Sequence, residues 1–415
     1  MKKSASRIIT IIFLCLMPVW MFASKDVKFS EKENRYMATF PKISAETVKN
    51  GSFMTDFETY LTDQFPVRDA CIALKTNTLR LFGQRRINGV YIASNGYLIA
   101  GEEEFNEQKV EELTKSINKF AANVDKNVDV NFMLVPNAVS IYEAKLPYNV
   151  KSTQRDTMDF VKDNLSDKIR FVDVYDTLKD NVSQQLYYKT DHHWTTRGAF
   201  IAFTDYAKAV GLDTDSVDYD FMSVAGDFQG TQASNCGIYS SYDNVNICVP
   251  RNSKGSYVVN YIEKTEKKAT LFDESKLGEK DKYLVFMGGN YSEVDITTNA
   301  GTGKNLLVIK DSYANCMIPM LTPYYDHIIV VDPRYYYDDI YELVRGSGIT
   351  DVLFLYNVNS YVTDNSLEDI LKDLAFFVRA GRIELKANDV VAIKINGFLT
   401  SYRYCGLPCN LQGEH

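Results

Sequence analysis

Residues 306–313 read Leu-Leu-Val-Ile-Lys-Asp-Ser-Tyr, an apolar run that ends in an Asp-Ser pair. Such a run is typical of a buried strand, and the residues after it favour the start of a helix. Short apolar runs recur in the chain, several of them separated by helical patterns, at 128–135, 169–174, 283–287, 328–331 and 352–356. Strands that alternate with helices predict an α/β fold with a parallel sheet and helices on both faces. In such sheets, ligands bind at the carboxyl ends of the strands.

The segments between these runs predict further elements. Asn95-Gly96 between two apolar runs predicts a β-hairpin, because both residues tolerate positive φ. Residues from about 212 to 282 lose the alternating pattern and are interpreted as a β-rich insertion, rich in Gly, Ser and Asn. Apolar residues at helical spacing predict helices over 48–64, with an irregular start at Gly51, and over 110–124 and 157–165. A further helix is predicted through Leu74 and Leu81, and another from a cap at Thr195 or Thr196 to Gly211.

A second stretch, Lys189-Thr190-Asp191-His192-His193-Trp194-Thr195, holds two of the four histidines of the 415-residue chain. Side chains at i and i+2 of extended backbone point the same way, so Asp191 can hold one nitrogen of His193 and leave the other free. A serine hydroxyl needs such an oriented base to act as a nucleophile. We therefore predict that Asp191, His193 and Ser312 meet as an acyl-transfer triad. The plainer alternative for Ser312 is a helix cap, and for His192 it is packing or a single hydrogen bond.

Polar residues at other predicted strand ends are further candidates for the site. Unpaired backbone N–H groups at a helix start can stabilise an oxyanion, as can donors from neighbouring loops. Candidates for oxyanion or substrate binding are Tyr313, Gly289, Asn357, Arg334 and His192, with Arg334 suited to an anionic or polar substrate group. A metal site of Asp191, one adjacent histidine and His327 is a less favoured alternative, and we expect neither a metal nor a cofactor.

The N-terminus carries a targeting pattern. Basic residues precede an almost wholly apolar stretch from Ile8 to Ala23, so residues 1–24 are predicted to be a signal peptide or a membrane anchor, with 25–415 outside the cell. The net charge of −8, without a continuous basic run beyond the first residues, argues against nucleic acid as a partner. Cys236 with Cys248, and Cys405 with Cys409, are candidate disulfides in that compartment.

Several motifs together resemble the DHHW protein family and, more distantly, the SGNH-like O-acetyltransferases of alginate and other exopolysaccharides. They lie at 31–35, 63–69, 88–92, 191–194, 226–231, 309–313 and 331–336. The resemblance implies an SGNH-like α/β/α fold over residues 25–415, with Asp191 and His193 as triad carboxylate and base and Ser312 as nucleophile. It also implies a polysaccharide acceptor and an acetyl donor supplied through a membrane-bound O-acyltransferase.

Three functions are compatible with these patterns. The favoured one is an extracytoplasmic O-acetyltransferase that works through an acetyl-serine. A carbohydrate esterase or deacetylase would use the same triad, with water in place of the sugar hydroxyl. A non-catalytic cell-envelope assembly protein would keep the fold without the reaction.

Overall fold

An eight-stranded sheet forms the centre of the computed structural model, which describes residues 15–251, 256–372, 390–395, 398–404 and 411–413. The strand order is β11-β10-β12-β14-β13-β15-β6-β7. From one edge to the other these strands are Glu266–Lys268, Tyr257–Tyr261, Glu293–Thr298, His327–Val331, Asn305–Lys310, Asp351–Asn357, Asp129–Val135 and Ile169–Phe171. The strands from β14 to β7 pair in parallel, and β12, β10 and β11 extend the sheet through antiparallel pairs. The prediction of an α/β fold with a mostly parallel sheet is confirmed.

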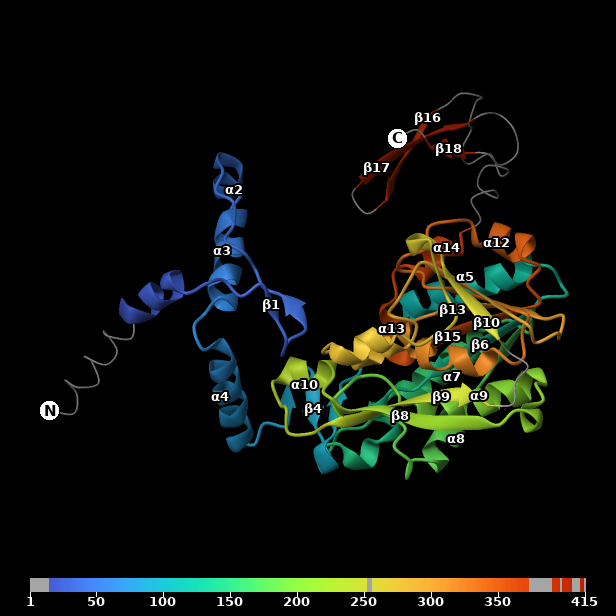
Figure 1. The fold of residues 1–415 in the computed structure, drawn as a ribbon, viewed down its shortest axis with the longest axis horizontal. Coiled ribbons are helices and arrows are strands. Elements are labelled where there is room, and N and C mark those ends of the chain that lie inside the picture. Colours follow the sequence, from blue (N-terminus) through green and yellow to red (C-terminus); the bar gives the residue numbers. More distant parts are fainter. Residues whose placement is uncertain (1–14, 252–255, 373–389, 396–397, 405–410, 414–415) are drawn as a thin grey trace.

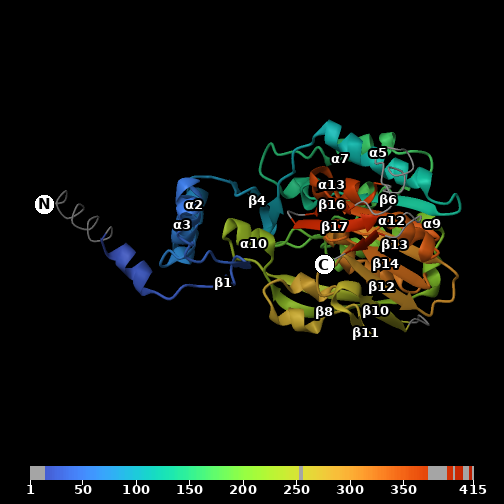
Figure 2. The same cartoon turned by 90° about the horizontal axis from the view of Figure 1, so that it is seen from above.

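Strand side chains alternate between two apolar cores, one on each face of the sheet. In β13, Leu307 and Ile309 pack into one core, whereas Leu306 and Val308 pack into the other. The first core is covered by α5 (Glu107–Asn123), α7 (Gln154–Asn164), α12 (Ile340–Gly346), α13 (Val358–Thr363) and α14 (Leu367–Ile370). The second is covered by α6 (Ala138–Ile141), α8 (Tyr175–Asp180), α9 (Thr196–Val210) and α11 (Ile318–Leu321). Helix, sheet and helix therefore form three layers, with α5 and α7 together on one side (Figure 2).

Local sequence signals explain several of these elements. The side chain of Thr195 accepts a hydrogen bond from the N–H of Gly198 and caps α9, which ends at Gly211 with φ 71°. The predicted hairpin is confirmed: β4 (Val90–Ile92) and β5 (Leu98–Ala100) pair around Asn95 and Gly96, both with positive φ.

One predicted strand is wrong. Residues 283–287 form a turn of 3₁₀ helix, η6 (Lys282–Val285), then an isolated bridge from Phe286 to Phe272, and then a turn. The side chain of Asp281 accepts a hydrogen bond from the N–H of Tyr283 and starts the turn, and three successive residues with positive φ, Met287, Gly288 and Gly289, follow it. A short apolar run does not by itself distinguish a strand from a buried helical turn.

Between α9 and η6, the chain forms a long hairpin of β8 (Tyr219–Phe228) and β9 (Asp243–Pro250), and its connection contains α10 (Thr231–Cys236). Cys236 and Cys248 are both free and buried, so the predicted disulfide between them is wrong. They pack into separate cores, Cys236 as the last residue of α10 and Cys248 in β9. Cys405 and Cys409 lie outside the described residues.

Residues 15–82, here called the N-terminal arm, stand to one side of the body in Figures 1 and 2. The arm contains a helical segment at 15–23 and then β1 (Phe29–Ser30), β2 (Arg35–Tyr36), α2 (Ala45–Lys49), α3 (Ser52–Asp63) and α4 (Arg68–Leu81). Residues 1–14, with much of the predicted targeting segment, lie outside the described residues. Among the described helices, none has both the length and the apolar character that a membrane crossing needs.

The remaining elements are short turns of 3₁₀ helix, the strand β3, which pairs with β4, and a separate three-stranded antiparallel sheet of β16, β17 and β18. They are β3 (Arg86–Ile87), η1 (Ser94–Gly96), η2 (Glu143–Lys145), η3 (Thr214–Ser216), η4 (Ile262–Lys264), η5 (Glu274–Gly278), η7 (Ser312–Cys316), β16 (Val390–Ile395), β17 (Phe398–Tyr404) and β18 (Leu411–Gly413).

Candidate active site

The two stretches singled out in the sequence meet at the carboxyl end of β13. The loop before α9 is closed by an antiparallel bridge between Tyr187 and Trp194 and by a hydrogen bond from the N–H of Tyr188 to the carbonyl of His193. Ser312 begins η7 directly after β13. A parallel strand that ends at this edge thus presents the hydroxyl to the loop.

Asp191, His193 and Ser312 form a continuous hydrogen-bonded chain. Nδ1 of His193 lies 2.6 Å from Oδ1 of Asp191, and Nε2 lies 2.8 Å from Oγ of Ser312. The backbone N–H of His193 also donates to Oδ1 of Asp191, at 3.0 Å. Asp191 and His193 are 3% and 6% exposed, so the base is oriented inside the protein and the hydroxyl lies at its outer nitrogen.

Asp191 is held as a carboxylate by groups from α10. The N–H and the hydroxyl of Thr231 both donate to Oδ2 of Asp191, at 2.9 and 3.0 Å. Gly230 lies so close that a Cβ there would overlap with the Asp191 side chain. Burial opposes ionisation, but the two adjacent imidazoles and these hydrogen bonds outweigh it and hold the pKa of Asp191 well below its usual range.

Tyr283, in η6, completes the support of the base. Its ring stacks on the imidazole of His193, with centroids 3.7 Å apart and planes 10° apart. Its hydroxyl donates to the backbone carbonyl of Ser312, at 3.0 Å. One side chain therefore contacts both the base and the nucleophile turn. The sequence pattern placed Tyr283 in a strand, and this role was missed.

A buried network joins the two turns beneath the triad. The indole N–H of Trp194 donates to the carbonyl of Tyr313, at 2.8 Å, and the hydroxyl of Tyr313 donates to the carbonyl of His192, at 2.6 Å. The side-chain amide of Asn137, after β6, donates to the same Tyr313 hydroxyl at 3.0 Å. Trp194 and Tyr313 are fully buried, so they fix the separation of the two turns.

Two of the predicted oxyanion donors are engaged elsewhere. The N–H of Tyr313 donates to Oδ1 of Asp311, at 2.8 Å. The side-chain amide of Asn357 donates to Oδ2 of Asp311 and to Oγ of Ser360, and its backbone N–H also donates to Asp311. Tyr313 and Asn357 therefore hold the nucleophile turn, and neither offers these groups to an oxyanion. Asp311 was recognised in the sequence only as a neighbour of Ser312.

The other three candidates for oxyanion or substrate binding lie around the turn that contains Ser312. They are Gly289, Arg334 and His192. Oδ1 of Asn290, next to Gly289, accepts from the buried Lys310 and from Asn315, so the Gly288–Asn290 loop is tied to both sides of Ser312. Arg334 forms a bidentate pair with Asp332 and lines a cavity of about 270 Å³ with Lys310 and Asp311. Nδ1 of His192 lies 2.7 Å from Oγ1 of Thr231, a single hydrogen bond as in the plainer expectation.

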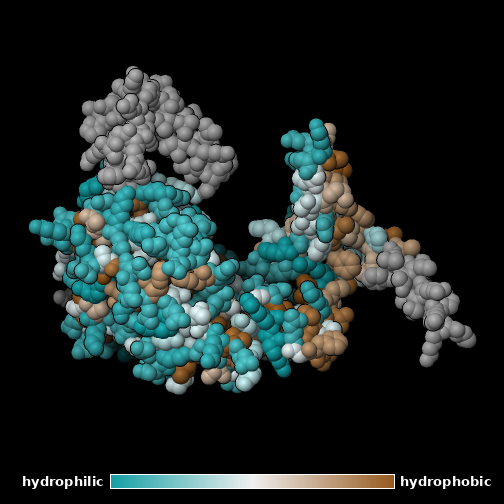
Figure 3. Space-filling view, turned by 180° about the vertical axis from the view of Figure 1, so that it is seen from behind, coloured by the Kyte–Doolittle hydropathy of each residue, from teal (hydrophilic) through white to brown (hydrophobic). Residues whose placement is uncertain are grey.

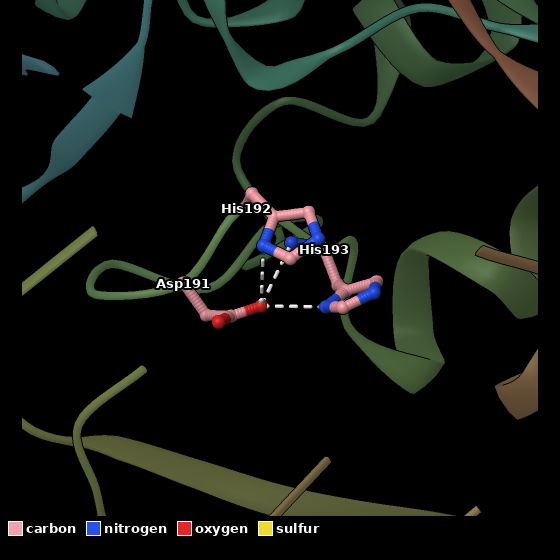
Figure 4. Close-up of side chains that lie close together, drawn as sticks. All are labelled: Asp191, His192 and His193. Atoms are coloured by element: carbon pink, nitrogen blue, oxygen red, sulfur yellow. Dashed lines mark hydrogen bonds and ion pairs between the residues drawn. The ribbon is translucent and has the colours of Figure 1, made fainter. Parts of the chain in front are cut away.

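The Asp191, His192 and His193 cluster is also the arrangement that could hold a metal ion (Figure 4). The Nδ1 of His193 and Oδ1 of Asp191 lie 2.6 Å apart, which is a direct hydrogen bond. Two ligand atoms of one tetrahedral zinc ion would lie about 3.3 Å apart, given zinc–ligand distances of about 2.0 Å. His327 begins β14 at the opposite end of the parallel strands and pairs with Asp295, so it does not join this cluster.

The N-terminal arm is attached to α10. Arg35 of the arm pairs with Asp63, with Nη1 2.8 Å from Oδ2, and the Arg68 guanidinium pairs with Glu33. The carbonyl of Lys32 accepts hydrogen bonds from Ser234, at the end of α10 away from Asp191, and from Tyr239. Two motifs from the N-terminal region thus form one ion-pair cluster that supports the helix whose other end holds Asp191.

Comparisons with known proteins identify one family and several solved structures with a similar fold. The family model of the DHHW protein matches residues 102–331, which is more than half of the chain. No curated protein matches the chain significantly. Two solved structures share the fold. The DHHW family protein of Eubacterium siraeum is 23% identical, with a TM-score of 0.60, over 68% of this chain and 95% of that chain. Bacillus cereus PatB1 with a sulfonyl adduct is 18% identical, with a TM-score of 0.57, over 68% of this chain and 100% of that chain.

A weaker likeness, with a TM-score of 0.43 and 13% identity, is to the O-acetyltransferase domain of Pseudomonas putida AlgJ, over 71% of this chain and 99% of that domain. The family assignment rests on the family model, whose matched region includes Asp191, His193 and Ser312. This chain belongs to the DHHW protein family.

Proposed function

We propose that this protein is an extracytoplasmic O-acetyltransferase that modifies a polysaccharide through an acetyl-serine on Ser312. The observation that supports this proposal most strongly is the hydrogen-bonded chain from Asp191 through His193 to Ser312. The order of the groups is that of a serine nucleophile with an oriented base. The sequence resemblance to O-acetyltransferases supports acetyl as the transferred group. The apolar N-terminal stretch supports a location outside the cytoplasm.

In the first half of the reaction, Oγ of Ser312 attacks the carbonyl carbon of an acetyl ester or thioester, and Nε2 of His193 takes the hydroxyl proton. The tetrahedral intermediate collapses, the bond to the leaving group breaks, and the imidazolium returns the proton to that group. The products are acetyl-Ser312 and the free alcohol or thiol. Asp191 stays ionised throughout, so it stabilises the imidazolium at the moment when that charge forms.

In the second half, a sugar hydroxyl attacks the acetyl-serine and gives its proton to His193. The serine leaves, takes this proton back, and the acetylated sugar departs. We assign the oxyanion to the N–H of Gly289, in the loop tied to Lys310 and Asn315, and substrate contacts to Arg334 and to the exposed edge of His192. The acetyl group reaches Ser312 from a membrane-bound O-acyltransferase.

The proposal is tested by incubating the protein with para-nitrophenyl acetate and a panel of oligosaccharides, with acetylated sugar and free acetate measured separately. We expect acetylated sugar from wild type and none from Ser312→Ala or His193→Ala. Ser116→Ala, on the exposed face of α5, is the matched serine control and should retain full activity. Free acetate without acetylated sugar, for every acceptor, would identify an esterase instead. No turnover of any kind would favour an assembly role.

A further inference from the structure

Apolar side chains are exposed on the N-terminal arm far more than on the body. Of the 23 large apolar side chains that are exposed in the described chain, 14 lie between residues 16 and 82. Figure 3 shows a band of hydrophobic surface along one side of the arm. Isolated exposed apolar residues are ordinary, but a collection of this kind marks a surface that contacts something else.

Helix α4 shows the pattern most clearly because its two faces differ. On the inner face, Thr76 is buried and its hydroxyl donates to the carbonyl of Cys236 in α10, at 3.0 Å. On the outer face, Leu74 and Leu81 lie seven residues apart and are 69% and 87% exposed, and Val67, which precedes the helix with φ 55°, is 52% exposed. Phe82 follows at 86%. Residues seven apart share one side of a helix, so this is an apolar stripe that faces away from the body.

After the first turn of α4, which contains Asp69, the charges around this stripe have one sign. The sequence contains no Asp or Glu between Asp69 and Glu102, although the whole chain has a net charge of −8. Within that interval the charged residues are Lys75, Arg80, Arg85 and Arg86, and all four are exposed. An apolar stripe beside basic side chains is the composition of a helix that lies in the interface of an anionic membrane.

The helical segment before β1 also exposes apolar side chains. Residues 15–23 are helical, and Leu16, Val19 and Trp20 are exposed there. We propose that the outer face of α4, together with Phe82, lies in the headgroup region of a membrane that contains anionic lipids. This contact adds to any attachment through residues 1–24, and it acts on α10 through the inner face of α4. It does not depend on the proposed reaction.

The test uses the full chain in the background Trp20→Phe, which leaves the buried Trp194 as its only tryptophan. Leu81→Trp places a reporter on the stripe, and Tyr148→Trp places one at a site that is 94% exposed outside the arm. Both proteins are reconstituted into vesicles of phosphatidylcholine and phosphatidylglycerol with brominated or ordinary acyl chains. We expect bromine to reduce the emission at position 81 about twofold and to leave that at position 148 unchanged. Adding Arg80→Glu and Arg85→Glu should reduce the quenching.

Three results would overturn the proposal. The first is unquenched emission at position 81 although the protein sediments with the vesicles. The second is failure of the full chain to sediment with them. The third is a blue shift at position 81 that depends on protein concentration in the absence of lipid, which would assign the stripe to a second copy of this chain. Because both reporters replace exposed side chains, a folding defect is tested simply by comparing their unfolding transitions with that of wild type.

Discussion

At the scale of single residues, the arrangement of Asp191, His193 and Ser312 depends on neighbouring residues that take no part in the proposed reaction. Thr231 supplies two hydrogen bonds to Asp191, and Gly230 leaves room for that carboxylate. Tyr283 contacts His193 by its ring and the Ser312 carbonyl by its hydroxyl. The orientation of His193 is therefore set from both sides, by a carboxylate along one edge and by an aromatic ring over one face.

The space at Gly230 can be tested by adding one methyl group. Gly230→Ala should displace the Asp191 carboxylate, leave His193 unoriented and lower the rate of Ser312 acetylation about 10²–10⁴-fold, in the range seen when a triad carboxylate is lost. Gly278→Ala is the matched control, because a Cβ at that position meets no atom within 4 Å. The rate is followed by release of para-nitrophenol. Equal rates for the two variants would show that Gly230 does not constrain the carboxylate.

Two substitutions separate the roles of Tyr283. Tyr283→Phe keeps the stacked ring and loses only the contacts of the hydroxyl with the carbonyls of Ser312 and Tyr313, so we expect a decrease in acetylation rate of about two- to tenfold. Tyr283→Leu also loses the stacking, so its acetylation rate should be at least tenfold lower than that of Tyr283→Phe. Single-turnover acetylation kinetics measure both. If the acetylation rate of Tyr283→Leu is no lower than that of Tyr283→Phe, then the ring does not position His193.

At the scale of elements, short turns hold the residues of the candidate active site, and the regular elements position the turns. The strands β13, β15 and β6 could be predicted because each is a continuous apolar run between two cores. Helix α9 could be predicted because Thr195 and Gly211 mark its ends. The turn η6 could not be predicted, because the side-chain cap from Asp281 outweighs the apolar pattern of residues 283–287.

The cap of η6 predicts a pH dependence of stability. Burial, together with repulsion from Asp191, raises the pKa of Asp281 to about 6 from the ordinary 3.8. The folded state then binds this proton more tightly than the unfolded state, so the contribution to stability is full below pH 3.8 and is lost as the pH rises through 6. Relative to Asp281→Asn, whose amide oxygen can still cap the turn, the wild-type free energy of unfolding should fall by about 1–3 kcal/mol between pH 4 and pH 7. Urea unfolding of both proteins at both pH values measures the free energies of unfolding. If the difference between wild type and Asp281→Asn is the same at pH 4 and pH 7, the prediction is wrong.

At the scale of the whole molecule, residues far apart in the sequence meet in two places. Asp191 and His193 meet Ser312 across more than a hundred residues, and that pairing could be predicted because both motifs lie where the loop at a strand end meets a helix. The second meeting place is the ion-pair cluster next to α10, which could not be predicted. It contains Arg35, Asp63 and Glu33. The motifs at 31–35, 63–69 and 226–231 were recognised as shared features, but ion pairs occur on most surfaces, and a sequence does not show which charges meet.

The central claim is that Ser312, activated by His193, carries the acetyl group. The most direct measurement is peptide mapping by mass spectrometry after a short pulse of an activated acetyl ester and an acid quench. We predict one added acetyl group on the peptide that contains Ser312, absent from Ser312→Ala and decreased at least a hundredfold in His193→Ala. An acetyl group on another residue, or one on Ser312 that His193→Ala leaves unchanged, would contradict the account.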